Sequence, residues 1–387
     1  THIMECLKKK LKFVVASCSF KGSLSAAQAS SIMARSIKNA LASKFELDVI
    51  EVPIADGGEG TVDCFLQALK GERAYVRVLN PLQKEIEAYY GILPDNVAII
   101  EMAAASGLCL INSNELNPLK TTTFGTGQLI KSALDRGCKK IIIGLGGSAT
   151  NDSAHGMENA LGAKFLDFDG KEVEEVGGGT LDRIAKIDLS SFDARVKDCE
   201  FIAASDVQNP LCGKRGATYV FGPQKGVTED MKEDLDSKLL HFGKLLEKTF
   251  DKTIIEKPGA GAAGGLGAGV LSFLDAKIYS GIELLKEIIR FDEKILDADY
   301  IFTGEGQIDD STLDGKALLG VLESAKKQNI PVIGFAGKLP LDEQGLYDAG
   351  FQSLFSISNG PIPLEYAMQN AEKLLENAVH RVCRLIK

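Results

Sequence analysis

The fold is decided by the stretch Lys12-Phe-Val-Val-Ala-Ser17-Cys-Ser-Phe-Lys21-Gly-Ser-Leu-Ser25-Ala-Ala-Gln28, close to the start of the chain. Its first six residues form a largely apolar run that predicts a buried strand. Ser25 and Gln28 have the spacing of a capping box, so they predict the start of a helix. A strand, a loop and a capped helix in this order are typical of an α/β fold.

The same alternation continues on both sides of this stretch. The helix after Ser25 has apolar residues at helical spacing, and a second apolar strand is predicted over 47–54. Near the end of the chain we expect strands over 300–303, 331–335 and 351–357, a helix near 315–328, and one closing helix. The apolar face of that closing helix is expected to consist of Leu364, Ala367, Met368, Ala371, Leu375, Ala378, Val379 and Val382.

The middle of the chain has a different pattern. Residues 73–102 predict several consecutive strands, with turns at Asn80-Pro81 and Pro94-Asp95. Buried strands are expected over 140–144 and 200–204, and a hairpin turn at Asp169-Gly170. We therefore predict a parallel doubly wound sheet domain from residues 1–62 and 285–387, interrupted by a mixed α/β domain over 63–284. The active site is expected in the cleft between the two domains.

Composition narrows the class of protein. The 387 residues are 45% hydrophobic and 25% charged, which suits a globular enzyme of two domains. A net charge of -9 argues against nucleic acid or an anionic membrane as a partner. The eight cysteines lack metal-binding spacing, and there is no apolar run of membrane-spanning length or secretory h-region, so a cytoplasmic protein with reduced thiols is expected.

Reactive or flexible residues follow five strands of the predicted parallel sheet. The loops cover 19–23, 55–61, 304–309, 336–338 and 358–360. Ligands of open parallel sheets bind beyond the carboxyl ends of the strands, so these loops are expected to share one site. The alternative is that they are ordinary surface loops.

The first of these loops has the composition of an anion site. Ser19, Lys21 and Ser23 lie between a strand and a helix start, where free backbone N–H groups favour a phosphate or a carboxylate. Lys338, after a later strand, is a further candidate for phosphate binding. The alternative for such lysines is simple solvation.

Three carboxylates in the same set of loops suit magnesium. Asp56 is followed by glycines that let the backbone approach a ligand closely, and Glu305 and Asp309 lie in a similar setting. These three residues are the candidate metal ligands. The alternative is a pair of glycine-rich turns with solvated acids.

The middle domain contains a second candidate phosphate loop. Gly146, Gly147 and Ser148 lie between a predicted strand and a helix, as phosphate-binding backbone does. Asn151 and Asp152 follow; they are candidate ligand contacts, or alternatively only a helix cap.

Another carboxylate, Asp206, closes the strand predicted over 200–204. It is either a functional acid at a strand end or part of an Asx-turn before Pro210.

Known nucleotide motifs give a mixed result. The pattern GxxxxGK[ST] is absent, which excludes a P-loop. Gly259-Ala-Gly261-Ala-Ala-Gly264 matches GxGxxG, but Lys257-Pro258 stand where a strand should precede it. A nicotinamide-dependent dehydrogenase acting on a small hydroxy acid therefore stays open as an alternative.

Taken together, the motifs resemble the type-1 glycerate kinases. The similar segments cover 19–26, 55–61, 144–157, 206–211, 220–226, 258–269 and 303–309, in order along nearly the whole chain. The resemblance implies a flavodoxin-like domain joined to a second mixed α/β domain. It also implies phosphorylation of D-glycerate by ATP with Mg²⁺, at the 2-hydroxyl group.

For such a reaction we hypothesise one role for each candidate residue. Lys21 would neutralise the transferring phosphoryl group, and Asp152 or Asp206 would receive the glycerate proton. The partners expected are small molecules, and a homo-oligomer is left open. One departure from the family pattern is Cys18, where an aspartate is usual; a catalytically silent nucleotide or sugar-acid sensor is therefore a second alternative.

Overall fold

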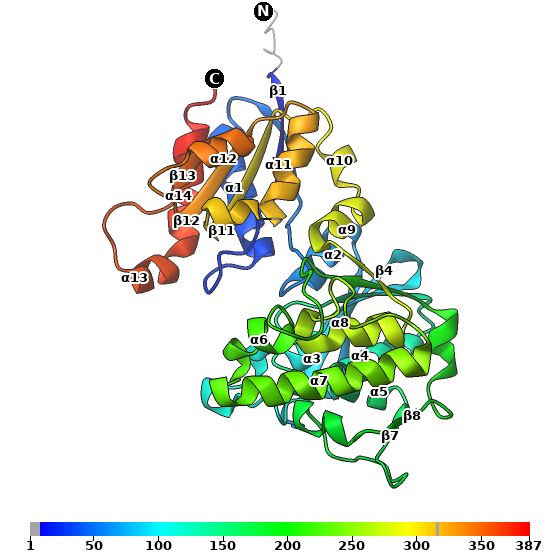
Figure 1. Cartoon of the computed structure of the whole chain (residues 1–387). Helices are drawn as coiled ribbons and strands as arrows, with labels where there is room; N and C mark the ends of the chain where they lie inside the picture. The colour runs from blue at the N-terminus through cyan, green and yellow to red at the C-terminus, as the bar shows by residue number, and fades with distance from the viewer. Residues whose placement is uncertain (1–7, 315–316) are drawn as a thin grey trace, which may run out of the picture. The chain divides into compact units, whose positions relative to one another are not determined.

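The computed structural model describes residues 8–314 and 317–387 and divides into two compact units (Figure 1). Unit 1 contains the chain up to Asp56 and from Ile282 onward, and unit 2 contains Gly57–Gly281. The chain thus leaves unit 1 after residue 56 and re-enters it at residue 282, whereas the sequence analysis had put these points at 62 and 285.

Unit 1 is built on one parallel sheet of five strands. The strands, in spatial order, are β2 (Glu46–Glu51), β1 (Lys10–Val15), β11 (Tyr300–Gln307), β12 (Val332–Lys338) and β13 (Phe351–Ser356). Numbered along this unit alone, the order is 2-1-3-4-5, which is the flavodoxin-like order. The predicted fold class is confirmed, and the five strands that precede the candidate loops do belong to one sheet.

The helix predicted from the capping box is α1 (Ala26–Leu41). The Gln28 backbone N–H donates to Ser25 Oγ at 3.1 Å, and the Ser25 N–H donates to Gln28 Oε1 at 2.9 Å, so both halves of the capping box are present. The other helices of this unit are α9 (Gly281–Ile288), which starts at the unit boundary, α10 (Phe291–Lys294), η7 (Asp310–Leu313), α11 (Ala317–Lys327), α12 (Gln344–Ala349), α13 (Leu364–Gln369) and α14 (Ala371–Cys383).

The single closing helix predicted from the sequence is wrong, because the chain forms α13 and α14 with a break at Asn370. Asn370 has φ -108° and ψ 16°, and its side-chain amide donates to Tyr366 O at 2.8 Å. The two helices therefore do not share one buried face. Leu364 on α13 is 76% exposed, whereas Leu375 on α14 is fully buried.

Unit 2 contains a mixed sheet of six strands. In spatial order these are β10 (Lys277–Tyr279), β9 (Glu200–Ala204), β6 (Lys140–Gly144), β5 (Val97–Glu101), β4 (Glu85–Leu93) and β3 (Glu72–Leu79). The run from β5 to β10 is parallel, and β3, β4 and β5 form an antiparallel meander, as the sequence pattern predicts. A small pair, β7 (Lys164–Leu166) and β8 (Lys186–Asp188), lies outside this sheet.

The helices of unit 2 pack around this sheet (Figure 1). They are α2 (Thr61–Leu69), α3 (Ala103–Ser106), α4 (Phe124–Asp135), α5 (His155–Ala160), α6 (Ala217–Phe221), α7 (Glu229–Phe250) and α8 (Ala262–Ser272). Short 3₁₀ turns are η1 (Pro94–Asn96), η2 (Leu108–Leu110), η3 (Ser113–Glu115), η4 (Gly178–Arg183), η5 (Ala194–Asp198) and η6 (Pro223–Lys225).

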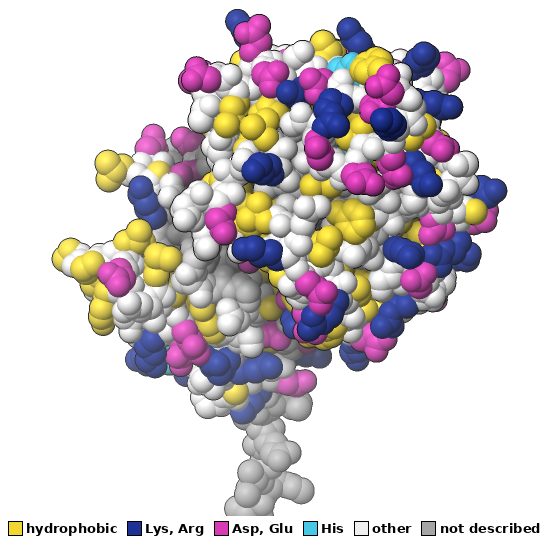
Figure 2. Space-filling view, turned by 90° about the horizontal axis from the view of Figure 1, so that it is seen from below, with side chains coloured by type: hydrophobic (Ala, Val, Ile, Leu, Met, Phe, Trp, Pro, Cys, Tyr) yellow, Lys and Arg dark blue, Asp and Glu magenta, His cyan; other side chains and the backbone are white. Residues whose placement is uncertain are grey.

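The surface of the described residues carries charges of both signs (Figure 2). On the face shown in Figure 2, lysine and arginine side chains alternate with aspartate and glutamate, without a continuous basic patch. No disulfide bond joins the seven cysteines in the described part of the chain. No helix within the described ranges is both long and apolar enough to cross a bilayer.

Candidate functional site

The loop after β1 forms a tight turn between Phe20 and Leu24. The Phe20 N–H donates to Leu24 O at 2.8 Å, and the Leu24 N–H donates back at 3.0 Å. Ser23 Oγ also donates to Phe20 O, at 3.0 Å, so the Ser23 hydroxyl stabilises the turn itself. Ser19 and Lys21 are exposed, and Lys21 makes no side-chain hydrogen bond or ion pair with another described residue.

Three of the five predicted loops of unit 1 touch one another. The Cys18 N–H donates to Gly304 O at 2.9 Å. A Cβ atom added at Gly306 would lie 3.2 Å from Lys21 N, and one added at Gly337 would lie 2.8 Å from Gly306 O. The loop after β1 and the last residues of β11 and β12 are therefore contiguous. The loop predicted over 336–338 is wrong, because these residues end β12, and residues 304–307 of the loop predicted over 304–309 belong to β11. Lys338, the last residue of β12, is exposed, and its side chain likewise has no partner among the described residues.

The three carboxylates predicted as metal ligands are not brought together. Within residues 8–314 and 317–387, no three His, Cys, Asp or Glu side chains converge on one point. Asp309 instead caps η7 by accepting from the Ser311 N–H and hydroxyl and from the Gln307 side chain, and these hydrogen bonds lower its pKa. Asp56, in the segment after β2, and Glu305, within β11, are half-buried.

In unit 2, the two glycine-rich loops pack directly against each other. The Gly146 N–H donates to Gly57 O at 3.4 Å. A Cβ atom at Gly144 would lie 2.3 Å from Gly57 O, and one at Gly146 would lie 2.6 Å from Gly58 Cα. Real Cβ atoms do not come this close to backbone, so only glycine permits the contact.

The rest of the Gly144–Ser148 loop is fixed by backbone hydrogen bonds. The Leu108 N–H donates to Gly147 O, and the Ala149 N–H donates to Ser106 O, both at 2.9 Å. Gly147 has φ +77° and is exposed, whereas Ser148 is only 5% exposed. The loop therefore offers backbone at Gly147 to solvent on a rigid base.

Asn151 and Asp152 lie inside the unit rather than at its surface. Asn151 Nδ2 donates to Thr218 Oγ1 at 2.9 Å. Asp152 Oδ2 accepts from the Thr123 N–H at 3.0 Å, from the Thr123 hydroxyl at 2.9 Å and from the Gly156 N–H at 3.1 Å. Burial raises the pKa of Asp152 against these hydrogen bonds. This geometry favours the helix-cap alternative for Asp152, since it caps α5.

Asp206, the other candidate acid, is exposed beyond the carboxyl end of β9. Its Oδ1 accepts from the Gly281 N–H at 3.2 Å. The preceding Ser205 accepts from the Val207 N–H at 3.1 Å, which fixes the turn. Of the two proposed proton acceptors, Asp206 is the one that solvent can reach.

Two further charged residues were missed by the sequence analysis. Glu101 ends β5, where its Oε1 accepts from the Val62 N–H at 3.0 Å, and burial raises its pKa to about 7. Its position at the carboxyl end of a predicted strand was the signal that could have found it. Lys225 lies in the 220–226 segment and is 1% exposed; a buried lysine has no signature in the sequence pattern.

The GxGxxG match turns out to serve packing. A Cβ atom at Gly264 would lie 1.8 Å from Thr150 O, and one at Gly267 would lie 1.9 Å from Gly259 O. The strand that precedes α8 along the chain, β9, ends at Ala204, so the motif does not follow a strand. A dinucleotide fold requires that strand, and the dehydrogenase alternative loses its structural basis.

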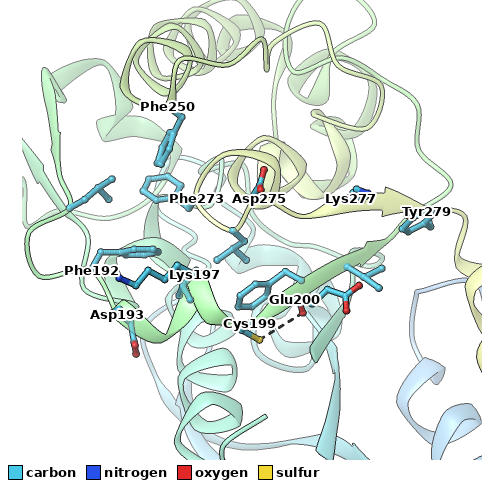
Figure 3. Close-up of a pocket in the computed structure, with 16 residues that line it drawn as sticks. Phe192, Asp193, Lys197, Cys199, Glu200, Phe250, Phe273, Asp275, Lys277 and Tyr279 are labelled. Carbon is cyan, nitrogen blue, oxygen red and sulfur yellow. Dashed lines mark hydrogen bonds between the residues drawn. The ribbon is translucent and has the colours of Figure 1, made fainter. Parts of the chain in front are cut away.

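A large cavity lies elsewhere in unit 2 (Figure 3). Its volume is about 730 Å³, and Phe192, Phe250 and Phe273 line one side. Glu200, the first residue of β9, also lines it, so it lies at the opposite end of that strand from Asp206. None of the candidate residues lines this cavity.

Comparisons with known proteins agree on one family. A sequence model of the glycerate kinase family matches residues 13–387. A glycerate kinase of Bacillus subtilis (strain 168) is 44% identical, covering 97% of this chain and 98% of that protein. A glycerate 2-kinase of Escherichia coli (strain K12) is 43% identical over 93% of this chain and 94% of that protein. The crystal structure of a putative glycerate kinase 2 from Salmonella typhimurium LT2 superposes with a TM-score of 0.86 at 40% identity, covering 98% of each chain.

Proposed function

Because the chain belongs to the glycerate kinase family, we propose that it transfers the γ-phosphoryl group of ATP to a hydroxyl group of D-glycerate. The observation that carries this proposal is the arrangement at the ends of three adjacent parallel strands of unit 2. The Gly144–Ser148 loop follows β6, and carboxylates lie at the ends of the flanking strands, Glu101 on β5 and Asp206 after β9. A glycine-rich loop between two acids at strand ends suits phosphoryl transfer to an alcohol.

Two lysines would supply positive charge for the reaction. Phosphoryl transfer depends mainly on positioning and on neutralising charge, and it needs little covalent help from the protein. Lys21, in the loop after β1, and Lys338, at the end of β12, are both exposed and have no other side-chain partner among the described residues. We propose that these two lysines bind the phosphate oxygens of ATP.

Magnesium would accompany ATP. Mg²⁺ bound to a nucleotide is held largely by phosphates and water, with one or two protein carboxylates, so a cluster of three acids is not required. The half-buried carboxylates of Asp56 and Glu305 fit that demand. Asp309 fits it less well, because its oxygens already accept from Ser311 and Gln307.

The proton of the glycerate hydroxyl group needs an acceptor. Asp206 is exposed at a strand end, whereas the oxygens of Asp152 are buried and accept from Thr123 and Gly156. We therefore propose Asp206 for this role and a structural role for Asp152.

The test is a coupled assay of ADP release over a panel of small hydroxy acids, followed by phosphorus NMR of the product. We expect turnover that depends on D-glycerate, and the similarity to the E. coli glycerate 2-kinase supports 2-phosphoglycerate as the product. Absorbance change with a nicotinamide cofactor would favour a dehydrogenase instead. Binding of ATP without turnover would favour a silent sensor, the alternative raised by Cys18.

A further inference from the structure

The side chain of Lys225 is buried in unit 2, beneath the Gly144–Ser148 loop. It ends η6, and the next residue, Gly226, has φ +97°, so a sharp turn directs the chain away. A fully buried lysine is rare because removing an ammonium group from water is costly unless it is paired. Lys225 is 1% exposed, so a specific set of contacts must hold it.

Those contacts tie Lys225 to the glycine loop. Lys225 Nζ donates to Ser148 Oγ at 2.7 Å and to Thr150 O at 2.8 Å. Both acceptors belong to the segment that follows Gly147, the loop residue exposed to solvent. Lys225 therefore holds the buried side of the loop in which Gly147 is exposed to solvent.

We propose that Lys225 is a positioning residue for the phosphoryl donor: its ammonium group fixes Ser148 and Thr150 and places a positive charge beneath the glycine loop, which strengthens binding of a phosphate there. The inference rests on the proposed function, since it assigns the phosphates of ATP to this loop. The effect is electrostatic and passes through the loop, because Lys225 itself is shielded from solvent.

Two more buried atoms indicate that this segment is built for polar contacts. Thr150 Oγ1 and Asn151 Oδ1 have no hydrogen-bond partner among the described residues, although both are shielded from solvent. Buried oxygens of this kind are uncommon in folded proteins and are often explained by a functional role. They follow Ser148 directly, on the same segment that Lys225 holds.

The charge of Lys225 changes with pH close to neutrality. Burial lowers the pKa of Lys225 to about 7, while the nearby carboxylate of Asp152, in the loop before α5, acts in the opposite direction. The amine is thus mainly an ammonium group below about pH 7 and mainly neutral above it. A bound phosphate should favour the ammonium form, so binding should take up protons.

The test compares Lys225→Met with Lys286→Met in the full chain. Lys286 is also buried, at 8% exposure, and its Nζ donates to Gly320 O at 3.0 Å in unit 1, so it is a matched control. At about pH 6 we expect Lys225→Met to raise the KM for MgATP about tenfold, with a smaller change in kcat. At about pH 8 the difference from the wild type should shrink to about twofold, because the wild-type amine is then largely neutral. Lys286→Met should follow the wild type.

The same KM ratio at both pH values, or a fall in kcat and melting temperature with KM unchanged, would overturn the inference. If Lys225→Met does not fold, the inference is tested by calorimetry of MgADP binding to the wild type. Buffers of different ionisation enthalpy give the number of protons taken up on binding. Proton uptake near about pH 7.5 supports the inference, and its absence refutes it. This binding measurement needs no turnover. It therefore tests the role of Lys225 even if the ADP-release assay finds no glycerate kinase activity and so refutes the proposed function.

Discussion

Replacing Gly144 by alanine should separate the two glycine-rich loops of unit 2. The new Cβ atom would lie 2.3 Å from Gly57 O, whereas ordinary contacts begin at 3.4 Å. Gly57 has little room to move, because its backbone packs closely against Ala204. A Cβ atom added at Gly57, which has φ +99°, would lie 2.8 Å from Ala204 O. The loops must therefore move apart by about 1 Å.

The size of the effect follows from that displacement. Overpacking at a rigid contact costs about 1–3 kcal/mol of unfolding free energy. A shift of about 1 Å in residues that position a substrate costs about 100-fold in rate. We therefore expect Gly144→Ala to lose about 100-fold in kcat for ADP release with glycerate, along with a modest drop in melting temperature.

Gly170→Ala is the control that separates displacement from lost stability. Gly170 has φ +79° in the tight turn after β7, and no atom lies within 4 Å of an added Cβ. Alanine there costs about 1 kcal/mol of backbone strain without moving either loop. If Gly144→Ala keeps turnover within about threefold of the wild type, or if Gly170→Ala loses as much, the proposed coupling of the two loops is refuted.

Three further changes test other parts of the proposal. Lys21→Met should reduce kcat at least about 100-fold in the ADP-release assay, while the exposed Lys171→Met leaves it unchanged; near-normal turnover in Lys21→Met would exclude the assigned role. Asp56→Asn should raise the Mg²⁺ concentration for half-maximal rate by about tenfold in a magnesium titration, and an unchanged titration would remove Asp56 as a ligand. Burial lowers the pKa of His155 to about 4, so between about pH 6.5 and about pH 4 the unfolded chain binds a proton that the folded protein does not, and stability falls as the pH falls. His155→Leu should remove about 2 kcal/mol of that loss at about pH 5 in urea unfolding, and an acid-side slope equal to the wild type would contradict it.

Local chemistry explains what the sequence predicted correctly. The capping box of Ser25 and Gln28 involves residues three positions apart, and the structure forms both of its hydrogen bonds. The strands at 140–144 and 200–204 were predicted with the observed bounds, because each is a short apolar run that ends in a turn. The five strands predicted before the candidate loops belong to one parallel sheet, which the alternation of strands and helices implies. Two of these strands, β11 and β12, run on into the segments predicted as loops.

The sequence by itself thus determined the fold class and the start of α1, since both depend on patterns within a few residues. Tertiary packing alone decided that Asp152 caps α5 from a buried position, that Asp309 is bound by its own loop, and that Gly57 meets Gly144. It also decided that Lys225 reaches Ser148, 77 residues away in the chain. The physical reason is that burial and long-range contacts depend on how distant segments meet, and no local pattern records that meeting.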